Sequence, residues 1–167
     1  MVEKLDFVLR AAFLGIGATV ILDLWSLFLK RFLGIPSANW GMIGRWIGHF
    51  PRGHIIHDNI AKAAPVRGEL AIGWAAHYAI GVIFAALLLA IMGPDWARHP
   101  TFLPALVFGF VTVAAPFFIL QPGIGAGIAA SKMPNPNVAR LRSLLTHAVF
   151  GIGLYGSALL AASLLRP

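Results

Sequence analysis

The chain has 167 residues, of which 59% are hydrophobic and 11% are charged, and its formal net charge is +7. A soluble domain of this length needs roughly 25% charged residues to cover its surface. Most of the outer surface must therefore face an apolar medium. The chain contains no cysteine, which excludes disulfides and thiolate metal ligands. Composition thus predicts an integral membrane protein.

Four apolar stretches, at about 8–31, 70–92, 102–120 and 140–165, are expected to cross the membrane. Each approaches or exceeds the roughly 20 residues that a helix needs to span a bilayer core. None alternates between apolar and polar residues, so a membrane β-barrel is disfavoured. The first stretch ends in Lys30–Arg31 without a small-residue cleavage site, which favours a retained helix over a signal peptide. We predict an all-α fold, with residues 1–167 as one four-helix integral-membrane domain.

The loops between these stretches carry further expected features. Residues 37–50 have the pattern of an interfacial amphipathic helix, with Trp40, Trp46 and Phe50 on its apolar face. The third loop, 121–139, is rich in glycine and small residues, and a short re-entrant segment is one interpretation of it. In the second loop, Trp96 has the character of a membrane-interface anchor.

Basic residues indicate the orientation, since Lys and Arg are in excess on the cytoplasmic side of membrane proteins. The side holding loops 34–69 and 121–139 carries nine of them: Lys30, Arg31, Arg45, Arg52, Lys62, Arg67, Lys132, Arg140 and Arg142. The opposite side carries four: Lys4, Arg10, Arg98 and Arg166. We expect both loops to be cytoplasmic and both termini to be periplasmic, in a bacterial inner membrane.

Polar side chains inside the apolar stretches mark a candidate site. Asp23, His77 and His147 each lie on a helix face that repeats small residues every four positions. Ionisable groups at membrane depth usually face the protein interior and mark functional sites. All three lie toward the cytoplasmic ends of their helices, as do Gln121 and Glu69. These five residues are the candidates for a ligand or proton site.

Several roles remain open for these residues. Asp23 is either a structural hydrogen-bonding group or a proton carrier, ligand or counter-charge. His77 and His147 share the pattern His-x-x-x-Gly, as a duplicated helical hairpin would leave. They are either neutral core histidines, proton-transfer groups, or metal or axial haem ligands.

The first loop supplies further candidate ligands and anion-binding groups. A metal site is one interpretation of the histidines and the acid in and near this loop, although their spacing matches no specific motif; its candidates are His49, His54, His57, Asp58, His77 and His147. Five arginines are either cytoplasmic anchors or clamps for anionic head groups: Arg45, Arg52, Arg67, Arg140 and Arg142. The expected partners are the lipid bilayer, anionic lipid head groups and further copies of the chain, but not nucleic acid.

Six motifs together resemble a family of integral-membrane proteins, domain of unknown function 2938. They lie at Gly17–Trp25, Asn39–His49, Pro51–Asp58, Gly73–Gly81, Ala115–Ser131 and Ala139–His147. The resemblance covers nearly the whole chain and implies a four-helix bacterial inner-membrane protein. It implies no activity and no binding residues.

Three classes of function are compatible with these patterns. The first is a small binding or transport protein whose Asp/His site couples protonation to a small molecule or ion. The second is a metal-dependent membrane enzyme that acts on a lipid or amphiphile. The third is an accessory subunit of a membrane complex. Of these, we expect the first.

Overall fold

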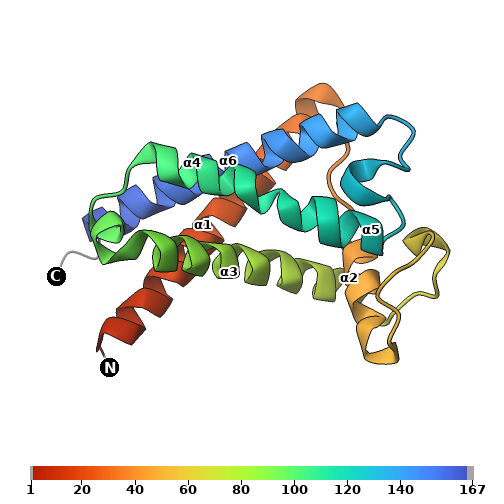
Figure 1. Ribbon diagram of the computed structural model, residues 1–167, viewed down its shortest axis with the longest axis horizontal. Coiled ribbons are helices and arrows are strands. Elements are labelled where there is room, and N and C mark those ends of the chain that lie inside the picture. Colours follow the sequence, from red (N-terminus) through yellow and green to blue (C-terminus); the bar gives the residue numbers. More distant parts are fainter. Residues whose placement is uncertain (1, 165–167) are drawn as a thin grey trace. The chain divides into compact units, whose positions relative to one another are not determined.

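The computed structural model describes residues 2–164, and these form an all-helical fold without a β-strand (Figure 1). Within this range, four helical segments are long and apolar enough to cross a membrane: Lys4–Leu33, Glu69–Arg98, Phe102–Gly123 and Pro136–Leu164. The all-α prediction and its four long apolar helices are therefore confirmed. The last residue of the predicted fourth span, Leu165, lies outside the described residues.

The helices extend beyond the predicted spans. Helix α1 (Val2–Leu33), α3 (Glu69–Arg98) and α6 (Pro136–Leu164) run 32, 30 and 29 residues. Within α3, Gly93 has a φ of 78° and precedes Pro94. A glycine adopts this positive φ without the clash that a Cβ would cause, and the helix bends there before the short connection to α4.

The third span is not a regular helix. It begins as α4 (Phe102–Thr112), passes through a π-helical turn, η3 (Pro116–Leu120), and ends in the short α5 (Gln121–Gly123). Proline lacks the N–H that an α-helix needs and clashes with the preceding turn. Pro116 therefore explains why the regular helix stops and a wider turn takes its place.

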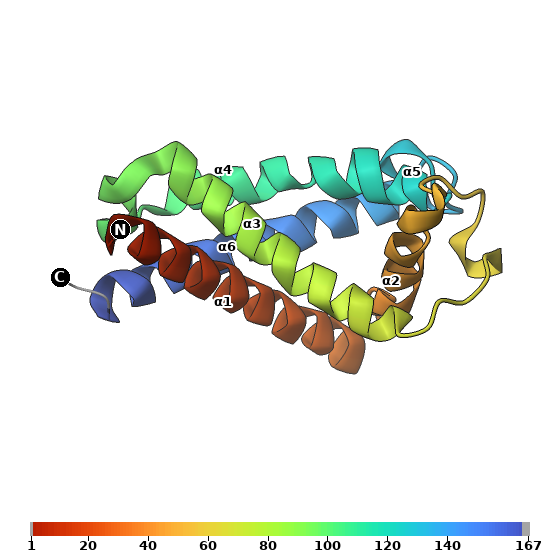
Figure 2. The same ribbon diagram turned by 90° about the horizontal axis from the view of Figure 1, so that it is seen from below.

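Contacts divide the chain into two compact units. Unit 1 comprises residues 1–37, 78–111 and 146–167, and unit 2 comprises residues 38–77 and 112–145. In unit 1, α1 crosses α3 near the middle of that helix, at Gly81 and Val82 (Figures 1 and 2). A Cβ on Gly15 would collide with the backbone at Gly81 and Val82, so only a glycine allows this approach. The predicted small-residue stripes of these two helices are therefore helix–helix contacts.

Close contacts at glycines also join other helices of unit 1. Gly109 of α4 and Gly151 of α6 meet backbone to backbone, and Gly153 of α6 lies against Ala18 of α1. Leu14, Leu88 and Leu154 fill the interior beside them and are almost fully buried. Large side chains such as Leu24, Ile91 and Leu160 point outward, between 58% and 70% exposed, as expected of helices that face lipid.

Trp96 differs from its predicted role. Its side chain is only 6% exposed, and its indole Nε1–H donates to the Thr101 hydroxyl at 3.2 Å. A side chain buried in the core of unit 1 does not lie at a lipid interface, so the prediction of an interface anchor is wrong. The bend at Gly93–Pro94 precedes this tryptophan in the chain.

Unit 2 is built around a short helix, α2 (Trp40–Gly48), where the sequence predicts a helix over 37–50. The side chain of Asn39 caps its N-terminus by accepting from the Met42 N–H at 3.1 Å. Helix α2 crosses the first turns of α3 (Figure 2), with Gly44 against the Glu69 carbonyl and Gly73 against Trp40. The remaining elements are η1 (Phe50–Arg52), η2 (Ile60–Lys62) and η4 (Ile128–Ala130).

Candidate functional site

Asp23 lies in α1 of unit 1 and accepts a hydrogen bond from a phenol. The Tyr78 hydroxyl, on α3, donates to Asp23 Oδ2 at 2.9 Å, and both side chains are half-buried. This hydrogen bond links the two helices that cross at Gly15 and Gly81. It gives a half-buried carboxylate within an apolar helix a fixed polar partner, without which its burial would be costly. Tyr78 was not among the residues predicted from the sequence.

His147 is the other predicted site residue in unit 1. Its side chain hydrogen-bonds to the backbone of Gly109 on the neighbouring helix α4. A glycine at 109 lets the two backbones approach, because a Cβ there would lie 2.6 Å from the His147 carbonyl oxygen. His147 thus lies where the backbones of α4 and α6 pack closely together.

In unit 2, His77 belongs to an aromatic cluster. Its ring stacks on Trp40 of α2 with centroids 3.9 Å apart, and Trp74 lies 5.8 Å away in an edge-on arrangement. Trp40 and Trp74 also contact each other at 5.5 Å. The ring of His77 is therefore held between α2 and α3 by two tryptophans.

Gln121, also in unit 2, follows the π-helical turn. Its amide Nε2 lies 3.4 Å from the Ser143 hydroxyl of α6, whereas its Oε1 is buried and has no hydrogen-bond partner among the described residues. Turning the amide over would place the oxygen where the Ser143 hydroxyl can donate to it. The residue therefore supplies one polar link between the third and fourth spans.

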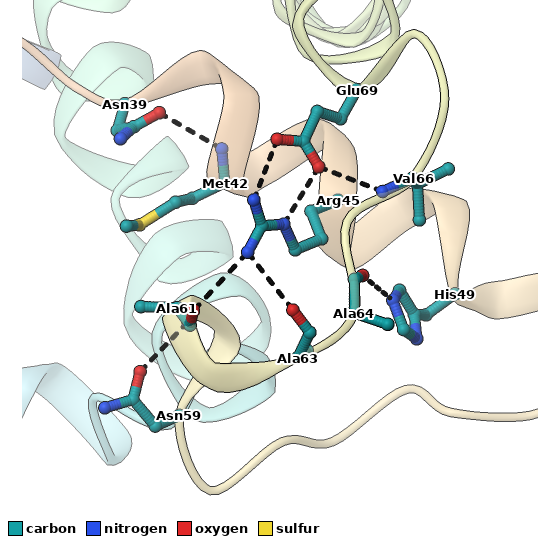
Figure 3. Close-up of polar contacts among 10 residues, drawn as sticks. All are labelled: Asn39, Met42, Arg45, His49, Asn59, Ala61, Ala63, Ala64, Val66 and Glu69. Atoms are coloured by element: carbon teal, nitrogen blue, oxygen red, sulfur yellow. Dashed lines mark hydrogen bonds and ion pairs between the residues drawn. The ribbon is translucent and has the colours of Figure 1, made fainter.

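Glu69 and Arg45 form an ion pair in unit 2 (Figure 3). Arg45 donates from Nε to Glu69 Oε2 at 2.8 Å and from Nη2 to Oε1 at 2.9 Å, the fork geometry that favours arginine over lysine. Glu69 Oε2 also accepts from the Val66 N–H at 3.1 Å. This bonding to the carboxylate raises the pKa of Arg45 above its ordinary value.

Arg45 also binds the backbone of the first loop. Its Nη1 donates to the carbonyl oxygens of Ala63 at 3.2 Å and Ala61 at 3.4 Å (Figure 3). One guanidinium therefore holds α2, η2 and the start of α3 together. Two predicted residues with separate roles, Glu69 for a ligand and Arg45 for a head group, are thus paired with each other as a structural clamp.

The other predicted arginines divide into two groups. Arg140 donates from Nε to the Ala129 carbonyl at 2.8 Å and from Nη1 to Asn137 at 2.9 Å, and so holds the third loop. Arg52, Arg67 and Arg142 are exposed, and within residues 2–164 their side chains form no hydrogen bond or ion pair. These three retain their full donor capacity for anions.

The structure gathers the histidines of the first loop as packed rings. His49 is 8% exposed, and one of its ring nitrogens, Nε2, lies 2.9 Å from the Ala64 carbonyl (Figure 3). The ring of His57 lies 5.1 Å from that of His49, and the ring of His54 lies 6.4 Å away, both edge-on. Across the described part of the chain, no three His, Asp or Glu side chains come together in a way that could hold a metal ion.

Fold and sites together define an all-α protein with four helices of membrane-spanning length and a polar hydrogen bond between two of them. Residues 12–161 match the family model described as protein of unknown function (DUF2938). The chain belongs to this family, and the resemblance in its sequence motifs is thereby confirmed. No curated protein and no solved structure matches the chain.

Proposed function

We propose that the chain is a multi-pass protein of the bacterial inner membrane. Its four long apolar helical segments would cross the bilayer. Both termini would be periplasmic, because the loops at 34–69 and 121–139, together with the residues flanking them, carry most of the Lys and Arg. The exposed leucines and isoleucines of α1, α3 and α6 support this placement, since water would not favour so much apolar surface.

Within the membrane, we propose that Asp23 binds a small cation or cationic ligand, and that binding is coupled to protonation. The single observation that carries this proposal is the hydrogen bond from Tyr78 to the Asp23 carboxylate, inside two apolar helices. A carboxylate at this depth attracts positive charge strongly because the surrounding dielectric is low. A proton and a cation then compete for the same oxygens, and such competition is the basis of proton-coupled binding or transport.

The phenol supports this role chemically. Its O–H donates to Oδ2 and thereby stabilises the carboxylate to which a cation would bind. Asp23 is half-buried rather than sealed, so a small ligand can reach it without unpacking the core.

A thermal-shift screen of the detergent-purified protein tests the proposal. The probes are sodium, potassium, ammonium and small quaternary ammonium ions, each at mildly acidic and mildly alkaline pH. We expect at least one cation to raise the melting temperature of the wild type, because a ligand that binds only the folded state stabilises it. The rise should be larger at the alkaline pH, where protons compete less.

Variants identify the site. Asp23→Asn should abolish the shift, and Tyr78→Phe should reduce it, whereas the matched control Asp95→Asn, at an exposed carboxylate near the end of α3, should leave it unchanged. The proposal is wrong if no cation stabilises the wild type, or if the shift persists in Asp23→Asn. A positive result leads to flux measurements in proteoliposomes with a pH-sensitive dye inside.

A further inference from the structure

The first loop presents two adjacent isoleucines to the outside. Ile55 and Ile56 are 56% and 78% exposed, between η1 and η2 and outside the four long helices. A large exposed side chain is ordinary on a lipid-facing helix. On a cytoplasmic loop, two neighbouring isoleucines form an apolar protrusion that needs a partner.

The loop holds this protrusion in place. The Trp46 indole donates to the Ile55 carbonyl at 2.7 Å, and the His57 N–H donates to the Gly123 carbonyl at 2.9 Å. The Ile60 N–H donates to the Ile124 carbonyl at 3.1 Å. Hydrogen bonds on both sides of Ile56 thus fix the backbone, and this fixed backbone keeps the side chains of Ile55 and Ile56 exposed.

The unit that carries the protrusion has an excess of positive charge. Unit 2 contains two carboxylates, Asp58 and Glu69, and seven basic side chains: Arg45, Arg52, Lys62, Arg67, Lys132, Arg140 and Arg142. Glu69 is already paired with Arg45. Arg52 and Lys62 flank the isoleucines in the chain, both exposed and without a charged partner in the described residues.

We infer that this loop is a membrane anchor for anionic lipid, in which Ile55 and Ile56 enter the boundary between head groups and acyl chains. Arg52 and Lys62 then contact the lipid phosphates. Charge complementarity selects this occupant, because an anionic leaflet attracts basic groups next to an inserted apolar tip. The inference rests on the proposed crossing of the membrane by the four helices, but not on the cation site at Asp23.

Spin labelling of the whole chain in vesicles tests the anchor. Because the chain has no native cysteine, Ile56→Cys gives a single labelling position without background mutations. The probes are vesicles of phosphatidylcholine alone or mixed with phosphatidylglycerol. The readout is the ratio of the label's collision rate with oxygen to its collision rate with a water-soluble nickel chelate. In mixed vesicles we expect the label to lie about 5–10 Å into the boundary region.

Two controls separate this inference from membrane insertion itself. Ile91→Cys, 70% exposed on α3, should report the acyl region in both vesicle types. Arg52→Gln with Lys62→Gln should move the Ile56 label outward in mixed vesicles, whereas Arg98→Gln, exposed near the end of α3, should not. The gain in depth from anionic lipid should also shrink at high salt.

Each outcome decides between the possibilities. If the label at Ile91 reports lipid but the label at Ile56 reports water in both vesicle types, the anchor is overturned and the membrane topology stands. If the label at Ile56 lies at the same depth in both vesicle types, and the Arg52→Gln/Lys62→Gln variant does not change that depth, the role of anionic lipid is overturned. If Ile91 reports water, membrane insertion and the anchor fail together.

Discussion

At the scale of single residues, unit 2 depends on one guanidinium. Arg45 bonds both oxygens of Glu69 and two backbone carbonyls. Since a planar fork makes these bonds, neither Lys nor an apolar side chain can replace it. Removing one partner leaves the other charge without its counter-ion in a half-buried position, which is costlier than losing both.

We therefore expect Arg45→Met and Glu69→Gln each to lower the melting temperature of the detergent-purified protein. The double variant should be less destabilised than the sum of the two, since the single changes share one interaction. Arg67→Met, at an exposed arginine of the same loop, is the control and should change little. Additive effects of Arg45→Met and Glu69→Gln would contradict the clamp.

Sequence reasoning found these two residues but not their relation. Arg45 and Glu69 lie 24 positions apart in the chain, and no periodicity predicts that a short helix will cross the next span at Gly44 and Gly73. Likewise, Asp23 was identified by its position in an apolar helix. Nothing in the sequence around Tyr78 marks it, because its bond to Asp23 depends on how α1 and α3 pack. Pairings between elements depend on tertiary packing, which hydropathy does not contain.

At the scale of elements, small residues decide where helices meet. The long apolar helices could be predicted because hydropathy and length are local properties of the chain. The π-helical turn at Pro116–Leu120 was missed, although the proline inside an apolar stretch was its signal. The burial of Trp96 was missed because composition alone does not say which side of a helix packs inward.

Two glycines of α6 test this picture within one helix. Gly151→Ala should destabilise the protein by about 1–3 kcal/mol, the usual cost of overpacking, because its Cβ would lie 2.8 Å from the Ala105 carbonyl. Gly156→Ala should stabilise by up to about 1 kcal/mol, since Ala favours helix and nothing lies within 4 Å of its Cβ. Thermal unfolding in detergent measures both, and equal effects would contradict the close approach of α4 and α6.

At the scale of the whole molecule, basic residues and apolar helices together predict how the chain lies in the membrane. Single cysteines in the cysteine-free chain report this directly with a membrane-impermeant maleimide on intact cells. Asp95→Cys, on the loop predicted to be periplasmic, should be labelled without permeabilisation. Lys62→Cys should be labelled only after the cells are permeabilised. The reverse pattern would invert the topology and place the basic loops outside.

The π-helical turn has a consequence for the family's evolution. A π turn holds one residue more than an α turn, so the insertion of a single residue into an α-helix would produce one. Deleting one residue from Phe117–Leu120 would restore α-helical spacing and rotate Gln121 by about 100° relative to the preceding turns. Relatives of this chain that lack one residue here should therefore have lost the pairing of Gln121 with Ser143, and their residues at these two positions should have changed together.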